Sequence, residues 1–271
     1  MDTARSLFQH AGSALFETPS LRFLWLCPTW FGFPLSPTPI LTVPWSQLTT
    51  LRLGKAPRIY EDSDPSYGLD TRRLLDRLRL CTSLSSLSFY LAERRRWPGL
   101  WEEEPLTSEQ VALLPNLCSL SLEGSLCPIN LSSYIHAPNL RYLKLNQKPE
   151  RLSVSTFAAQ KCGVKAWIEV YGAQLTGIEL GQCSALWKAE LIQCLRQLPL
   201  VRHLKLCVQR QRVFRPSTAG QPLLEDLVEN EQSVMDDEVL QLLTPGDEGA
   251  GCLLPRLKCL DVMMEDGYAF K

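Results

Sequence analysis

The stretch APNLRYLKLN, residues 137–146, carries three leucines in the spacing L-x-x-L-x-L. The same spacing occurs in LPNLCSLSLEG at 114–124 and in LPRLKCLDVM at 254–263. In each copy the last two apolar residues alternate with other residues, which is the period of a strand with one buried face. The apolar positions repeat, while the residues between them change. The repeated and the variable residues are therefore expected to have different roles.

This spacing occurs eight times if Ile, Val and Phe are allowed at the apolar positions, at intervals of 23 to 56 residues. The units begin at Leu21, Leu48, Leu84, Leu117, Leu140, Leu175, Val201 and Leu257. They predict strands at 24–26, 51–53, 87–89, 120–122, 143–145, 178–180, 204–206 and 260–262. A motif of this kind, repeated along a chain, is the signature of leucine-rich repeats.

The segments between the units contain apolar residues at helical spacing. They predict helices over 70–80 and 188–198, and a third helix that starts near 233–236 and holds Val239 and Leu243. The residues TSEQ at 107–110 form a capping-box pattern, which predicts a further helix that includes Val111 to Leu114.

A strand, a helix and a strand running in constant direction require parallel pairing, because each strand returns through a crossover. No single unit can bury its own leucines, so neighbouring units have to share one core. The sequence therefore predicts an α/β fold, a leucine-rich-repeat-like solenoid with a curved parallel sheet on its concave side and helices outside. Residues 1–271 form a single domain of about eight irregular repeats in this interpretation.

Strand alternation places the residues between the apolar positions on the concave face. The candidate protein-binding residues there are Trp25, Arg52, Tyr90, Glu123, Tyr142, Lys144, Glu179, His203, Lys205 and Asp261. They combine aromatic rings with both signs of charge, and such a mixture is typical of protein-binding surfaces. The alternative is an ordinary solvated sheet face without a partner.

Composition excludes several other function classes. The net charge of -1 and the pI of about 6.3 predict no bulk attraction to nucleic acid or to anionic membranes. No phosphate-binding loop, nucleophile motif or zinc-ligand spacing occurs, so the expected protein is not an enzyme and has no cofactor or metal. The ten cysteines are interpreted as reduced, small buried hydrophobic residues, which favours the cytoplasm or the nucleus.

A long acidic segment interrupts the repeats. Nine acidic and no basic residues occur between Pro216 and Pro255, and six basic and no acidic residues occur between Leu191 and Leu224. A long acidic loop or insertion is therefore expected around 216–250. It is interpreted as a solvated loop or as an arm that contacts a partner or folds over the basic strand.

Several stretches together resemble one known family. TPSLRFLWL at 18–26, VPWSQLTTLRL at 43–53, APNLRYLKL at 137–145 and CLLPRLKCLDV at 252–262 are similar to the leucine-rich-repeat region of F-box proteins from mushroom-forming fungi. The resemblance covers about residues 15–265. It implies that the repeats hold a protein substrate for a cullin-RING ubiquitin ligase.

An F-box itself is not evident, because the chain enters a repeat almost directly, at SLFQHAGSALFETPSL. Contact with the cullin-RING ligase adaptor is therefore expected only if an F-box lies upstream. Otherwise the expected function is a non-enzymatic protein-binding repeat domain. The alternative is a structural or regulatory leucine-rich-repeat protein unrelated to ubiquitin.

Overall fold

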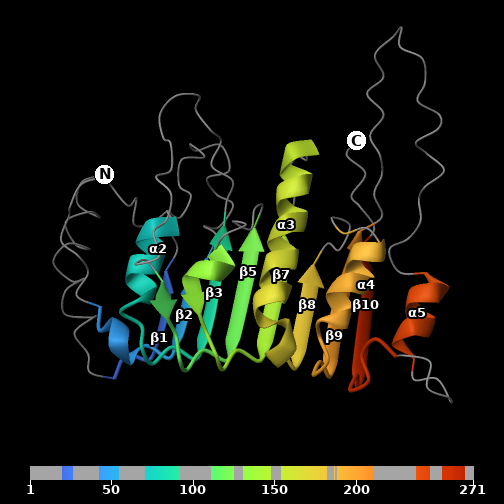
Figure 1. The fold of residues 1–271 in the computed structure, drawn as a ribbon. Helices are drawn as coiled ribbons and strands as arrows, with labels where there is room; N and C mark the ends of the chain where they lie inside the picture. The colour runs from blue at the N-terminus through green and yellow to red at the C-terminus, as the bar shows by residue number, and fades with distance from the viewer. Residues whose placement is uncertain are drawn as a thin grey trace, which may run out of the picture.

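In the computed structural model the chain has a mixed α/β fold built on one large parallel sheet (Figure 1). The structure describes residues 20–26, 43–54, 71–91, 111–124, 131–147, 154–181, 186, 188–209, 236–244 and 252–265. Eight strands lie side by side in chain order and the sheet does not close into a barrel. They are β1 (Phe23–Leu26), β2 (Thr50–Leu53), β3 (Ser86–Leu91), β5 (Ser119–Gly124), β7 (Tyr142–Gln147), β8 (Gly177–Gly181), β9 (His203–Gln209) and β10 (Cys259–Glu265).

The eight strands expected from the leucine spacing are confirmed, and every neighbouring pair is parallel. Each strand enters the sheet through the same hydrogen bonds. The N–H groups of Thr49 and Thr50 donate to the carbonyl of Arg22, and those of Ser85 and Ser86 donate to the carbonyl of Thr49. The pattern continues to β10, so the register is constant although the sequence intervals between the strands vary.

The helices that the structure describes lie on the same side of this sheet (Figure 1). They are α2 (Thr71–Leu78), α3 (Val154–Tyr171), α4 (Lys188–Arg196) and α5 (Asp237–Leu243). The three helices expected from apolar spacing correspond to α2, α4 and α5 and are confirmed. The sequence interpretation did not include α3, which is the longest of the described helices.

The helix predicted over Val111 to Leu114 is wrong. Residues Ala112–Leu113 form strand β4, which pairs in parallel with β6 (Ile135–His136) in a second, two-stranded sheet. The N–H of Leu114 donates to the carbonyl of His136 at 2.9 Å, so a tertiary contact supplies the partner that a helix would have provided. The capping-box residues 107–110 lie outside the described residues. The described residues also contain three short 3-10 helices, η1 (Trp45–Gln47), η4 (Leu131–Tyr134) and η5 (Gly172–Gln174).

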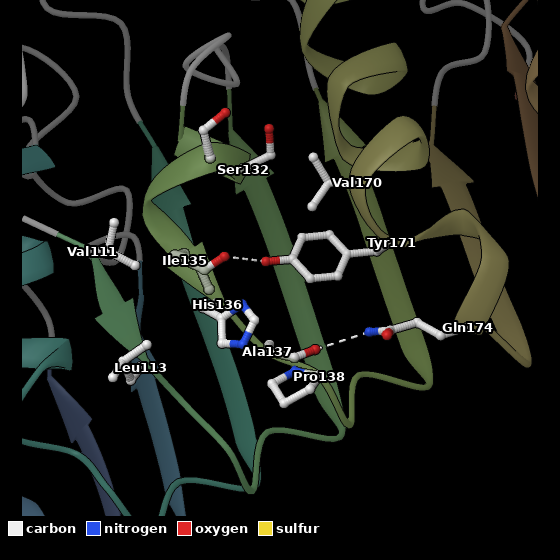
Figure 2. Close-up of a pocket in the computed structure, with 11 residues that line it drawn as sticks. Val111, Leu113, Ser132, Ile135, His136, Ala137, Pro138, Val170, Tyr171 and Gln174 are labelled. Carbon is white, nitrogen blue, oxygen red and sulfur yellow. Dashed lines mark hydrogen bonds between the residues drawn. The ribbon is translucent and has the colours of Figure 1, made fainter. Parts of the chain in front are cut away.

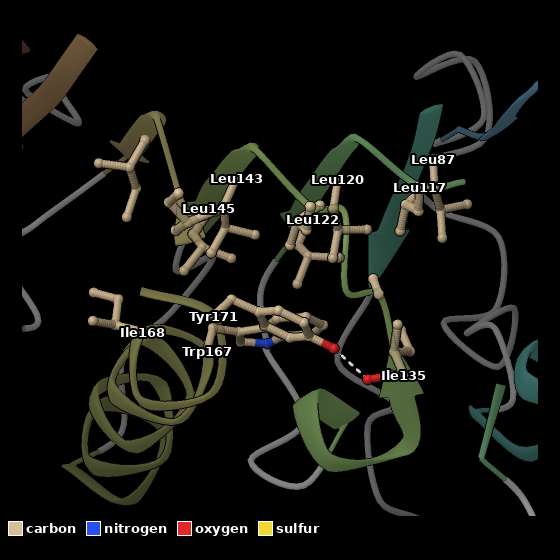
Figure 3. Close-up of a cluster of buried hydrophobic side chains, with 14 of the residues drawn as sticks. Leu87, Leu117, Leu120, Leu122, Ile135, Leu143, Leu145, Trp167, Ile168 and Tyr171 are labelled. Carbon is tan, nitrogen blue, oxygen red and sulfur yellow. Dashed lines mark hydrogen bonds between the residues drawn. The ribbon is translucent and has the colours of Figure 1, made fainter. Parts of the chain in front are cut away.

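The core fills the space between the large sheet and the helices. Figure 3 shows Trp167 and Tyr171 of α3 beneath Leu120 and Leu143 of the sheet. The exposed fraction of Trp167 and of both leucines is 0%. The Tyr171 hydroxyl donates to the Ile135 carbonyl, which ties α3 to the small sheet. Repeated leucines therefore serve one continuous core, as the sequence predicts.

Part of the acidic segment belongs to this architecture. Asp236 caps α5 by accepting a hydrogen bond from the Val239 N–H at 3.0 Å. Lys188 of α4 bonds to Asp236 at 2.6 Å and also to Glu238. Hydrogen bonds to these two carboxylates raise the pKa of Lys188. In the described part of 216–250 two acidic side chains, Asp236 and Glu238, thus bind α4, and the rest of that segment lies outside the described residues.

Only some of the described cysteines are buried like hydrophobic residues. Cys81, Cys194 and Cys207 are buried, whereas Cys118 and Cys259 are exposed. The interpretation of the cysteines as buried is therefore wrong for these two, which stand between the apolar positions of their units. Among the described residues, none of the helices has the length and apolar content that a membrane crossing requires.

Candidate functional site

The face of the large sheet opposite the helices is called the open face here. The ten predicted binding residues all lie on it, because they alternate with the buried leucines and share the strand register. Arg52, His203 and Asp261 are exposed, and the exposed fractions of Trp25 and Tyr142 are 64% and 37%. The other five are half-buried: Tyr90, Glu123, Lys144, Glu179 and Lys205.

At the amino-terminal end, aromatic rings and a guanidinium group form one exposed cluster. Phe23 and Trp25 of β1 are 51% and 64% exposed, and the Arg52 guanidinium of β2 lies 5.9 Å from the centre of the Phe23 ring. Gly54 makes room for the indole, since a Cβ atom at position 54 would come within 2.7 Å of Trp25 Nε1. Large exposed rings beside an arginine are the groups that dominate protein interfaces.

In the centre, charged side chains of four strands form a connected network. Lys144 Nζ lies 3.4 Å from Glu123 Oε1 and 3.5 Å from Glu179 Oε1. Lys205 Nζ lies 3.7 Å from Glu179 Oε1, and the Tyr142 hydroxyl donates to Glu179 Oε2 at 3.0 Å. Glu179 is the least exposed member and connects the others. The structure thus brings five of the predicted residues together, and these charges already have partners within the chain.

Local sequence explains how Tyr142 reaches Glu179. The neighbouring position on β8 is Gly177, and a Cβ atom there would lie 2.8 Å from Tyr142 Cδ2. The glycine therefore lets the phenol ring lie across the strand. Partial burial and the hydrogen bond to Glu179 raise the pKa of Tyr142 to about 12, so its hydroxyl stays a donor at neutral pH.

Between these two clusters the open face carries mainly small hydroxyl side chains, with Tyr90 of β3 as the exception among the described residues. Ser86 and Ser88 of β3 pair in register with Ser119 and Ser121 of β5. Sequence reasoning missed Ser119, and it also missed Asn146 and Met263 on the same face. Asn146 and Met263 lie one alternation step beyond Lys144 and Asp261, and Ser119 lies two steps before Glu123, so extending the pattern along each strand would have found them.

A second candidate feature lies on the helix side. A cavity of about 550 Å³ is bounded by the small sheet, η4 and α3, and Figure 2 shows its lining. Leu113 and Val170 are exposed at its edge, while Tyr171 and Gln174 donate to the carbonyls of Ile135 and Ala137. These two bonds occupy the edge of β6 that faces α3.

Ser132 is the unusual residue of this cavity. Its exposed fraction is 1%, and its hydroxyl has no hydrogen-bond partner among the residues that the structure describes. An unpaired buried hydroxyl lowers stability, because it has lost its bonds to water and gained none. We therefore expect Ser132→Ala to leave the free energy of unfolding unchanged or to raise it by up to about 1 kcal/mol in urea denaturation. Ser133→Ala, at an exposed site, is the control, and a loss larger than about 1 kcal/mol in Ser132→Ala alone would contradict the assignment.

The described side chains of the open face offer aromatic rings, hydroxyl groups and charges of both signs. Within the described ranges no group of three or more His, Cys, Asp and Glu side chains is arranged to hold a metal ion. The aromatic cluster, the serine side chains of β3 and β5 and the charge network together form a broad surface that combines apolar, polar and charged groups. Comparison of the chain with models of protein families, with curated proteins and with solved structures found no match.

Proposed function

We propose that the chain is a leucine-rich-repeat solenoid whose open face binds another protein. The solenoid proposal is supported by the sheet, in which each unit of the sequence contributes one strand beside the strand of the preceding unit. It is also supported by the constant hydrogen bonds between successive units and by the helices on one face. Stacked repeats make such regular contacts with their nearest neighbours.

The binding proposal rests on one observation, the exposed cluster of Phe23, Trp25 and Arg52. In the same strands Leu24 and Leu51 are 6% and 1% exposed, so the chain buries its apolar residues efficiently on the other face. Trp25, 64% exposed, and Phe23, 51% exposed, instead form an apolar patch outside the core. We therefore propose that β1 and β2 hold the anchor of the partner and that the charge network sets its orientation.

The test is capture of the native partner by the double variant Trp25→Ala with Arg52→Ala. Capture is expected to fall at least about tenfold, because truncating interface anchors of these types costs about 2 kcal/mol or more. The melting temperature is expected to stay within about 2 °C, because both side chains are exposed. Quantitative co-purification from cells that express equal amounts of each form gives the measurement.

The matched control is Gln193→Ala with Arg196→Ala, two exposed positions on α4. Alanine favours helix formation, so this variant keeps its fold and should capture as much partner as the wild type. Loss of capture in the α4 variant, with full capture by the Trp25 and Arg52 variant, would assign binding to the helix side.

The specific role in this proposal is substrate recognition for an F-box-type ubiquitin ligase, in the cytoplasm or the nucleus. It rests on the resemblance of the repeat stretches. Its test is the level of the captured partner with and without proteasome inhibition, together with co-purification of the ligase adaptor. A partner that binds the open face, keeps a constant level and brings no adaptor would favour a structural or regulatory repeat protein.

A further inference from the structure

The two ends of the described sheet differ in how they bury their apolar row. Leu24 on β1, at one end, is 6% exposed. On β10, at the other end, Leu260 and Val262 are each 36% exposed although they occupy the positions equivalent to the buried Leu204 and Leu206 of β9. The core row therefore continues to β10, where it is only partly covered.

The same residues of β10 present backbone groups at this edge. The N–H of Cys259 donates to the Arg202 carbonyl, which directs the backbone of Cys259, Asp261 and Met263 toward β9. Leu260 and Val262 alternate with them, so their N–H and C=O groups point to the free edge of the described sheet. A long strand with unpaired backbone groups and an apolar row pairs readily with another strand.

We infer that a second copy of this chain covers the edge, through antiparallel pairing of β10 with β10 about a two-fold axis. The axis passes through Val262, so that Val262 of one copy faces Val262 of the other. Leu260 then faces Met264, and the apolar core row runs on from one copy into the other. Leu260, Val262 and Met264 carry the backbone groups that point away from β9, and in this register they lie opposite one another. Their N–H and C=O groups can therefore form hydrogen bonds between the two copies.

Charge selects this register. Pairing must keep Leu260 and Val262 of both copies on the helix side of the sheet. Since side chains alternate between the two faces, one strand can be shifted along the other only by steps of two residues. Axes through Asp261 or Met263 would place Asp261 opposite Asp261 or opposite Glu265, and like charges directly opposite destabilise a strand pair. An axis through Leu260 would place Lys258 in the apolar row opposite Val262. Only the axis through Val262 places Asp261 opposite an uncharged residue, Met263, and keeps the row apolar.

Such a dimer has a consequence for binding. A two-fold axis perpendicular to the sheet leaves the open faces of both copies on the same side. The dimer would therefore present two copies of the Trp25 and Arg52 cluster to one partner or to two linked partners. The inference does not depend on what the open face binds, since it rests on β10 alone.

The experiment measures the mass of the purified full chain by sedimentation across a concentration series. The wild type is expected to dimerise, and Val262→Lys is expected to raise the dimer dissociation constant at least about 100-fold, because two lysines would meet at the axis. Met263→Lys is the matched control on the same strand, with nearly the same exposure of the original side chain. It places the new charge opposite Asp261, so its dissociation constant should stay within about threefold of the wild type.

A cysteine pair tests the register independently of these charges. Opposed residues of a hydrogen-bonded antiparallel pair have Cα atoms about 5.5 Å apart, which suits a disulfide. Val262→Cys should therefore cross-link two copies on mild oxidation, and Asp261→Cys should not exceed the wild-type background. A wild type that stays monomeric, equal dissociation by both lysine variants, or cross-linking through position 261 would each overturn the inference.

Discussion

Leu143→Ala is expected to lower the free energy of unfolding by about 2–5 kcal/mol. The side chain is 0% exposed and lies in register between Leu120 of β5 and Ile178 of β8. Removing it leaves a cavity that the neighbouring strands β5 and β8 cannot fill, because both are bound to β7 along its length. Urea denaturation of the purified chain measures the loss from the shift in midpoint.

Leu180→Ala should give a loss in the same range, since Leu180 is 2% exposed on the same core row. Leu113→Ala is the control, because it makes the identical chemical change at a leucine that is 60% exposed. Its effect should stay within about 0.5 kcal/mol. If the two core variants lost no more than the exposed one, the leucines would not form a shared core.

Trp167→Ala is expected to have the largest effect of any single change, about 3–5 kcal/mol. Trp167 is fully buried between α3 and the sheet, and its ring stacks on Tyr171 with centroids 5.6 Å apart. Its loss would also free Tyr171, whose hydroxyl links α3 to the Ile135 carbonyl. Chemical denaturation followed by circular dichroism measures the change.

Val170→Ala on the same helix is the control for this prediction, because Val170 is 51% exposed. Alanine also has the higher helix propensity, so the expected change is within about 0.5 kcal/mol of the wild type. An effect below about 1 kcal/mol for Trp167→Ala would mean that α3 does not pack on the sheet as described.

The strands of the large sheet could be predicted because their signal is local. Two apolar residues separated by one other residue, preceded by a third apolar residue, are enough to place Leu143 and Leu145 on β7. The order and direction of the strands then follow from the repeat and from the crossovers. For this reason irregular intervals of 23 to 56 residues did not prevent a correct assignment.

Helix α3 and strand β4 show where local signals are insufficient. Val164, Trp167, Ile168 and Tyr171 have helical spacing, but the helix also contains Gly163 and several β-branched residues, which weaken the pattern. At 111–114 the capping-box pattern favours a helix, yet pairing with β6 decides the outcome. Strand β6 lies more than twenty residues further along the chain, so the sequence around 111–114 does not indicate this pairing.

The candidate site could be predicted residue by residue but not as a network. Alternation places Lys144, Glu179 and Lys205 on one face without any knowledge of the register. Their contacts require three separate strands to align, which only the structure establishes. The partly covered apolar row of β10 was also unpredictable, because the sequence of this unit resembles that of units in the middle of the sheet.

Hydroxyl-radical footprinting of the complex between the chain and its captured partner tests the central claim most directly. The account predicts that the partner protects Trp25 and Tyr142 on the open face from oxidation. It also predicts that Leu113 and Val170, which are exposed on the helix side, react equally in the free and bound forms. Protection of Leu113 and Val170, with Trp25 and Tyr142 as reactive as in the free chain, would contradict the assignment of the open face as the binding surface.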